Sequence, residues 1–289
     1  VGNWRGGKNI VVQLGDQIDR KRGWNDFDVQ DRYPELEVFV YTQMLSEQAK
    51  KAGGAFYSLL GNHEMFSANP IYNYFVLDFF ERYVSTSDMR AYAYENMVDR
   101  SCVPSNTPSL NRHVMFKGGT GDIATKILST RGAVLKIGNV VFSHADVGAT
   151  TTENGGGAVL KDLNENAFKY LTTGEGNDPT LQQIGVTDGY DNNPVHALWN
   201  RFLCDPKRDC SKWLYNDTYF VAAHTIQSGR ITGKCEDHVW CINTQRSAAF
   251  GDDTSFERSQ SLKITINPGN NLDHVFEVLG AGNVPAVLR

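Results

Sequence analysis

Polar side chains able to bind metal follow two short apolar runs near the start of the chain. The first run ends at a glycine and leads into GDQID at 15–19, and the second leads in the same way into GNHE at 61–64. This order of apolar strand, glycine and polar cluster is typical of α/β proteins, which present their chemistry at the carboxyl edge of the strands. Carboxylate, amide and imidazole groups suit divalent cations such as Mn, Fe or Zn. The two segments therefore predict a metal site.

Two later segments add histidines to this set, namely SHAD at 143–146 and AHT at 223–225. Together the four segments resemble the calcineurin-like metallophosphoesterases, whose blocks are D-x-H, G-D-x-x-D, G-N-H-E/D, a strand-terminal H-G or H-A, and G-H-T. Arg20, directly after the second carboxylate, resembles the phosphoprotein phosphatase branch. GTG at 119–121 and LWNR at 198–201 are similar to its bacterial and Shewanella-like subgroup. The resemblance covers nearly the whole chain.

The resemblance implies a role for each polar residue of these blocks. Two divalent metal ions (Mn, Fe or Zn) are expected, and the ligands that this sequence supplies for them would be Asp16, Asn62, His144 and His224. His63, paired with Asp19, would protonate the leaving oxygen, because an imidazole near its reference pKa can donate a proton at neutral pH. Arg20 and Arg201 would hold the phosphate through their planar guanidinium groups. Basic residues follow Arg20, so Arg22 is an alternative to it.

The D-x-H block of the family is absent from the given sequence. Its Asp and His would complete the first metal site, but none of the fifteen residues before Asp16 forms an Asp-x-His. Either the sequence is a fragment or the enzyme is degenerate. We expect a fragment, because the other blocks are intact and loss of a central strand would expose a sheet edge.

The implied fold is an α/β two-sheet αββα sandwich, in a single domain over residues 1–289. Partly helical cap-like insertions are expected at about 66–115 and 151–195. The first of them is rich in aromatic residues. These rings either pack in the interior or wall the cleft, where they would contact a phosphotyrosine or a nucleobase.

Periodicity predicts the elements that position the blocks. Apolar residues at helical spacing, two closing lysines and a Gly-Gly pair predict a crossover helix over 36–51. A Gly-Asn pair predicts a hairpin within 133–142. A helix is also expected at 123–130, and further strands at 219–223, 239–243, 262–266 and 275–279.

Composition limits the partners. The chain has 289 residues and a net charge of -5 with no basic stripe, which disfavours nucleic-acid binding through phosphate neutralisation. No apolar stretch approaches the roughly 20 residues of a membrane helix. We expect a soluble protein without a nucleic-acid or membrane partner; the sequence does not give its oligomeric state.

The five cysteines are Cys102, Cys204, Cys210, Cys235 and Cys241. Cys204 with Cys210, and Cys235 with Cys241, would each close a short loop, but Cys210 with Cys235 is also possible, and spacing does not decide between them. Paired cysteines would indicate an oxidising compartment and free ones the cytosol.

The resemblance implies metal-dependent hydrolysis of a phosphomonoester, either a phosphorylated protein (Ser/Thr or Tyr) or a small molecule. One alternative is a diadenosine polyphosphate hydrolase, since that branch shares G-D-x-x-D-R and G-N-H-E. Another is a non-catalytic binding or scaffold protein that keeps the fold but has lost the first metal site. Relative turnover of phosphopeptides and dinucleotides separates the two enzymes.

Overall fold

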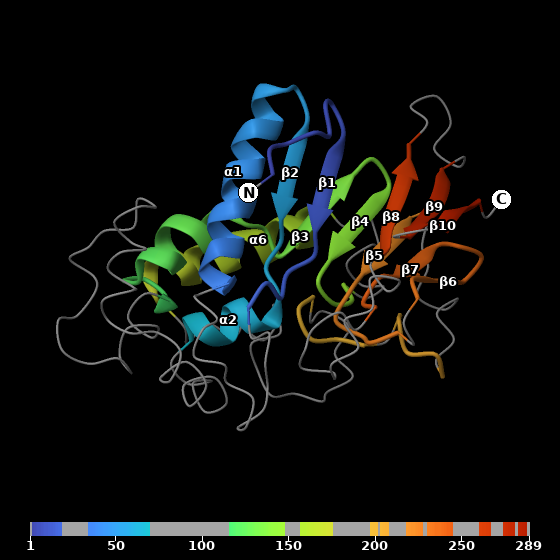
Figure 1. Ribbon diagram of the computed structural model, residues 1–289. Helices are drawn as coiled ribbons and strands as arrows, with labels where there is room; N and C mark the ends of the chain where they lie inside the picture. Colours follow the sequence, from blue (N-terminus) through green and yellow to red (C-terminus); the bar gives the residue numbers. More distant parts are fainter. Residues whose placement is uncertain are drawn as a thin grey trace, which may run out of the picture. The chain divides into compact units, whose positions relative to one another are not determined.

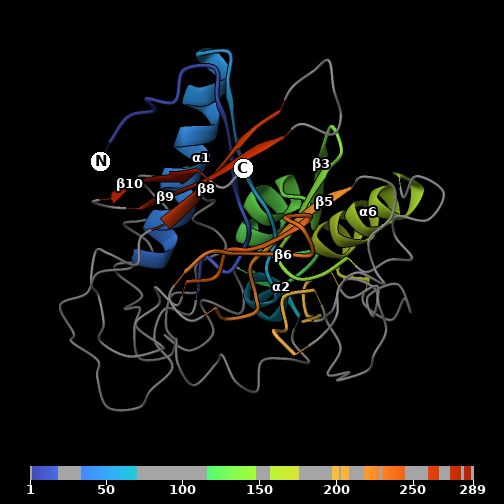
Figure 2. The ribbon, with the colours of Figure 1, turned by 90° about the vertical axis from the view of Figure 1, so that its right-hand side faces the viewer.

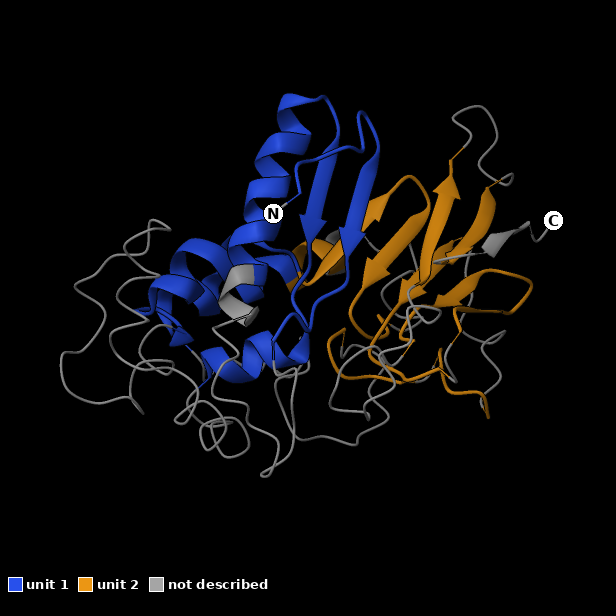
Figure 3. Ribbon diagram, viewed as in Figure 1, with its two compact units in different colours: residues 1–132, 164–181 blue, residues 133–163, 182–289 orange. Residues whose placement is uncertain are grey.

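The computed structural model describes residues 2–18, 34–69, 116–147, 157–175, 197–201, 203–207, 218–227, 230–244, 260–266, 274–280 and 283–287. The chain forms two compact units (Figure 3). Unit 1 comprises residues 1–132 and 164–181, and unit 2 comprises residues 133–163 and 182–289. The expectation of one domain with cap-like insertions stays a prediction, and most of both expected insertions lies outside the described residues.

Unit 1 is built on two parallel strands joined by a helix (Figure 1). β1 (Ile10–Gln13) pairs with β2 (Ala55–Ser58), and α1 (Pro34–Lys51) lies between them in the sequence and beside β2 in space. The predicted crossover helix is thus confirmed. Gly53 follows it with φ +79°, a conformation that glycine adopts without steric cost.

Short helices complete unit 1. They are α2 (Asn62–Ala68), a π-helical turn η3 (Ile123–Ile127) and a 3₁₀ turn η4 (Leu128–Thr130). The helix expected at 123–130 is therefore present, but its first part is a wider π-helix and its second part is a tighter 3₁₀-helix. α6 (Gly157–Thr173) begins in unit 2 and ends in unit 1, where the Tyr170 hydroxyl donates to the carbonyl of Ala68 at 3.1 Å. This hydrogen bond ties α6 to the end of α2.

Unit 2 contains a five-stranded sheet in the order β3-β4-β5-β7-β6. Its strands are β3 (Val134–Ile137), β4 (Val140–Ser143), β5 (Tyr219–Ala222), β6 (Thr232–Lys234) and β7 (Val239–Cys241). β4, β5 and β7 run parallel, while β3 and β6 are antiparallel edges. The predicted hairpin is the β3–β4 pair, with Gly138 at φ +60° in its turn. β4 and β5 are buried along their whole length, as expected of central strands.

A three-stranded antiparallel sheet in the order β10-β9-β8 completes unit 2 (Figure 2). It consists of β8 (Gln260–Thr265), β9 (Val275–Gly280) and β10 (Asn283–Val287). Aromatic rings join it to the larger sheet: Phe276 stacks on Trp240 with ring centroids 5.1 Å apart and contacts Tyr219 at 5.2 Å. The described residues thus form a mixed α/β fold, which confirms the expected class.

A disulfide bond joins Cys204 to Cys241, across 37 positions of sequence. Both short-loop pairings considered from spacing are therefore wrong. Contacts between segments distant in the sequence explain the observed pairing. The Lys234 ammonium on β6 donates to the carbonyls of Leu203 and Asp205, and β6 pairs with β7, which carries Cys241. The segment of Cys204 is thus held beside β7. Cys235 is also disulfide-bonded, and the expected alternative of Cys210 as its partner involves a residue outside those described.

None of the helices in the described part of the chain combines the length and apolar character that a membrane span requires.

Candidate metal centre

A tight turn follows β1, in which Gly15 has φ +77° and Asp16 has φ +52°. A left-handed backbone is unusual for a residue other than glycine, and such strain collects at functional sites. A β-carbon on Gly15 would lie 2.4 Å from the backbone nitrogen of Gly61. The turns that follow β1 and β2 therefore touch through their backbones, which requires glycine at position 15.

Glu64 holds these two turns together. Its carboxylate is fully buried and accepts hydrogen bonds from the backbone N–H groups of Asp16 at 2.9 Å, Gln17 at 2.6 Å and Gly61 at 2.7 Å. The bond from Gly61 is the capping-box contact at the start of α2. Sequence reasoning gave Glu64 no role, although a glutamate three residues after a helix N-cap is a recognisable capping signal.

The positive charge of Arg131 acts on this carboxylate. Its Nη1 donates to the side-chain oxygen of Gln17 at 2.5 Å, and its guanidinium lies over the ring of Phe39, 4.6 Å from the centroid. Burial raises the pKa of Glu64, and Asp16 acts in the same direction, whereas Arg131 opposes it. Burial likewise lowers the pKa of Arg131 to about 10, and Glu64 opposes that shift. The two buried charges thus stabilise one another.

His63 contacts the carboxylate of Asp16. Its backbone N–H donates to Asp16 Oδ1 at 3.1 Å, and its ring Nε2 lies 3.9 Å from Asp16 Oδ2. Asn62, the first residue of α2, is buried next to it. Unit 1 thus brings together Asp16 and His63, at the carboxyl ends of its two strands. Asp19, the predicted partner of His63, and Arg20, the predicted phosphate clamp, lie outside the described residues.

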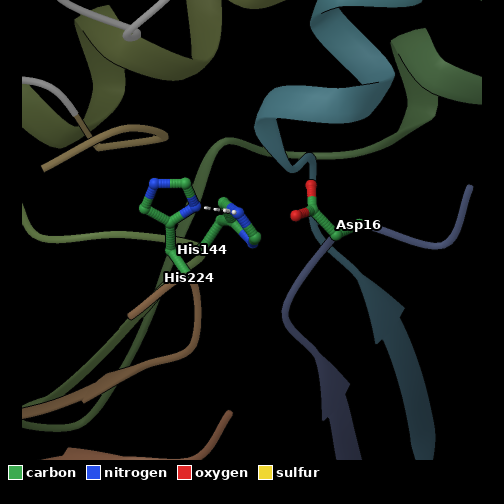
Figure 4. A group of neighbouring side chains, drawn as sticks. All are labelled: Asp16, His144 and His224. Carbon is green, nitrogen blue, oxygen red and sulfur yellow. Dashed lines mark hydrogen bonds between the residues drawn. The ribbon is translucent and has the colours of Figure 1, made fainter. Parts of the chain in front are cut away.

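In unit 2 the two histidines follow neighbouring parallel strands. His144 comes after β4 and His224 after β5, and the last residues of these strands, Ser143 and Ala222, pair in register. The rings meet, with His144 Nε2 3.1 Å from His224 Nδ1 (Figure 4). Both histidines are buried. Two imidazole nitrogens at this distance can share a proton. Unit 2 thus places the two histidines side by side, and their role as metal ligands stays a prediction.

The backbone of His224 is left-handed, with φ +22°, and two side chains hold its carbonyl oxygen. Arg201 Nη1 donates to it at 2.9 Å and the amide of Asn243 donates at 3.3 Å. The Trp199 ring lies beside the imidazole, with centroids 5.3 Å apart. Arg201, predicted to hold phosphate, is thus an exposed residue next to a predicted metal ligand.

The donor types fit a metal ion. Asp16 of unit 1 and His144 and His224 of unit 2, drawn in Figure 4, are one carboxylate and two imidazoles, which are donor types that divalent cations accept in proteins.

Comparison with known proteins supports the family resemblance, although no family model matches the chain. Shewanella-like protein phosphatase 2 of Arabidopsis thaliana is 23% identical over 279 residues, 86% of this chain and 65% of that protein. An uncharacterized protein of Acanthamoeba polyphaga mimivirus is 33% identical over 111 residues, 37% of each chain. The protein is a relative of the Shewanella-like phosphatases. It spans slightly less than two thirds of the Arabidopsis relative.

The fold comparison agrees. The crystal structure of a cold-active protein-tyrosine phosphatase from a psychrophilic Shewanella superposes with a TM-score of 0.60 and 16% identity, over 99% of this chain and 71% of that one. At this identity the likeness concerns the fold alone.

Proposed function

We propose that this protein hydrolyses phosphomonoesters with the help of bound divalent metal ions, and that its substrate is a phosphorylated protein. The observation that carries the proposal is the buried His144–His224 pair, whose ring nitrogens lie 3.1 Å apart at the carboxyl ends of two parallel strands. The similarity to the Arabidopsis Shewanella-like phosphatase supports the phosphatase assignment.

The proposed metal ligands are Asp16, Asn62, His144 and His224, and the proposed ions are two of Mn, Fe or Zn. Such ions would act as Lewis acids toward the phosphoryl oxygens and would activate water. The buried imidazole pair supports this assignment, because each ring can direct a lone pair to a shared cation in place of the other ring. The left-handed Asp16 turn is a second support, since strain of this kind is kept where function needs it.

We propose His63 as the acid that protonates the leaving alkoxide or phenoxide. Its ring Nε2 lies 3.9 Å from Oδ2 of Asp16, one of the proposed metal ligands. Asp19 is proposed as the group that orients it. Arg20 and Arg201 are proposed to bind the peripheral phosphate oxygens, where negative charge concentrates in the transition state.

The proposal also includes the two-sheet αββα arrangement in one domain. The Cys204–Cys241 disulfide supports an oxidising compartment.

The test is turnover of four substrates: p-nitrophenyl phosphate, phosphoserine and phosphotyrosine peptides, and diadenosine tetraphosphate. We expect both chelation and omission of metal to abolish turnover of the monoesters, and added Mn²⁺ to restore it. Faster cleavage of the dinucleotide would favour the diadenosine polyphosphate hydrolase. Binding of Mn²⁺ without turnover of any substrate would favour the non-catalytic alternative.

A further inference from the structure

Glu64 has no part in the proposed reaction, yet it is the most completely enclosed charged group in the described part of the chain. Its Oε1 accepts from the backbone of Gln17, and its Oε2 accepts from the backbones of Asp16 and Gly61. A single carboxylate therefore satisfies N–H groups from two turns. Asp16 is 48 positions and Gln17 is 47 positions from Glu64 in the sequence.

The position of these bonds relates Glu64 to Asp16. The N–H groups of Asp16 and Gln17 flank the α-carbon of Asp16, the residue whose φ is +52°. Both peptide planes next to this α-carbon are thus fixed from the same carboxylate. Since the direction of the Cα–Cβ bond of Asp16 follows from these two planes, Glu64 fixes the base of the Asp16 side chain.

A second contact fixes the same turn through a side chain. Arg131 donates to the side-chain oxygen of Gln17, and Arg131 is itself packed against the face of Phe39. Its charge also balances that of Glu64 in the interior, where an uncompensated carboxylate would be costly. The turn is therefore held by its backbone through Glu64 and by Gln17 through Arg131.

We propose that Glu64, supported by Arg131, is a positioning residue that orients Asp16 for metal binding. The role of Glu64 in metal binding rests on the proposed function. Its role in holding the Asp16 turn rests only on the hydrogen bonds. Glu64→Gln is the variant of choice because it keeps the shape of the side chain. It replaces one of the two acceptor oxygens with an NH₂ donor, which would face a backbone N–H group.

The first measurement is amide hydrogen exchange at Asp16, Gln17 and Gly61 in the metal-free protein. In Glu64→Gln we expect exchange at one or more of these amides to become at least about tenfold faster, because the carboxylate that protects them is gone. Asp122→Asn is the matched control, since it neutralises a different buried carboxylate of unit 1, one that pairs with Lys126. The control should leave these amides protected. Unchanged exchange in Glu64→Gln would overturn the inference.

The second measurement is Mn²⁺ affinity, from the electron paramagnetic resonance signal of the free ion. Loss of a residue that orients a metal ligand weakens metal binding about 10- to 100-fold. We expect this loss in Glu64→Gln, but little further loss when Glu64→Gln is added to Asp16→Asn, because the effect acts through Asp16. A general loss of stability would weaken binding equally in both backgrounds, and that additivity would overturn the inference.

If Glu64→Gln does not fold, Glu64→Asp gives the same two measurements with the charge kept and the reach shortened. If the parent itself binds no Mn²⁺, the proposed function fails, and with it the metal role of Glu64. The exchange measurement then still decides whether Glu64 holds the turn, so the two failures are distinguishable.

Discussion

Arg201 donates a hydrogen bond of 2.9 Å to the backbone carbonyl of His224. A predicted phosphate-binding arginine and a predicted metal ligand are therefore connected directly. A guanidinium has five N–H donors, so this bond is compatible with a phosphate on the same side chain. Arg201 could thus both hold the backbone of His224 and bind phosphate, and variants can separate these two roles.

Arg201→Ala is expected to lower kcat/KM by roughly 10² to 10³, about 2.7 to 4 kcal/mol, as when one preorganised charge-stabilising donor is removed. Inorganic phosphate should also inhibit the variant less well than the parent. Asn243→Ala is the control, because it removes the other hydrogen bond to the His224 carbonyl without removing a positive charge. Equal losses in the two variants, with phosphate inhibition unchanged, would assign Arg201 only to holding His224.

His144→Ala and His224→Ala are each expected to lower the metal content of the purified protein, measured by elemental analysis, by at least about half. Each removes a donor of the buried imidazole pair. His238→Ala serves as control: it is a histidine of the same unit whose ring stacks on Tyr219 at 4.7 Å. Metal content that stays at the parent level in both site variants would contradict their assignment as ligands.

His63→Ala is expected to keep its metal and to lose about 10²- to 10⁴-fold in turnover of an alkyl phosphate, the usual contribution of general acid catalysis. The loss should be smaller for p-nitrophenyl phosphate, whose leaving group needs little protonation. Steady-state kinetics with both substrates checks this. If His63→Ala loses metal instead, its contact with Asp16 serves metal binding rather than proton transfer.

Replacing both Cys204 and Cys241 by serine is expected to lower the free energy of unfolding by about 4 kcal/mol, the chain-entropy value for a loop of this size. Urea unfolding without reductant measures the effect. Ser129→Ala is a suitable control, as it removes a local hydrogen bond in unit 1. A change below about 1 kcal/mol in the double variant would mean that the unfolded chain keeps this segment compact without the bond.

Local pattern was enough to predict the elements that carry the site. The helix expected at 36–51 is found at Pro34–Lys51, and the hairpin around Gly138 is present. The proximity of His144 and His224 agrees with the family resemblance, which implies a common site for them; in the structure they follow neighbouring parallel strands, whose carboxyl ends lie at one sheet edge.

The contacts that hold the site in place were beyond such reasoning. Arg131 reaches Gln17 across 114 positions, and the disulfide of Cys204 crosses 37. Periodicity reports on neighbours within a few residues and carries no information about such pairs. Glu64 is the intermediate case, since its capping bond to Gly61 is local but its bonds to the Asp16 turn are not.

The boundary between the two units falls within α6, and this affects when unit 1 can fold during synthesis. Unit 1 draws on two separate stretches of chain, and the carbonyl of Leu171 and the hydroxyl of Tyr170 satisfy groups at Gly119 and Ala68. The stretch that ends at Gly132 therefore leaves the ribosome before the partners of these groups. At roughly 5 to 20 residues per second, several seconds of translation separate Gly132 from the end of α6. Chaperones that protect nascent chains would meet unit 1 in this incomplete state.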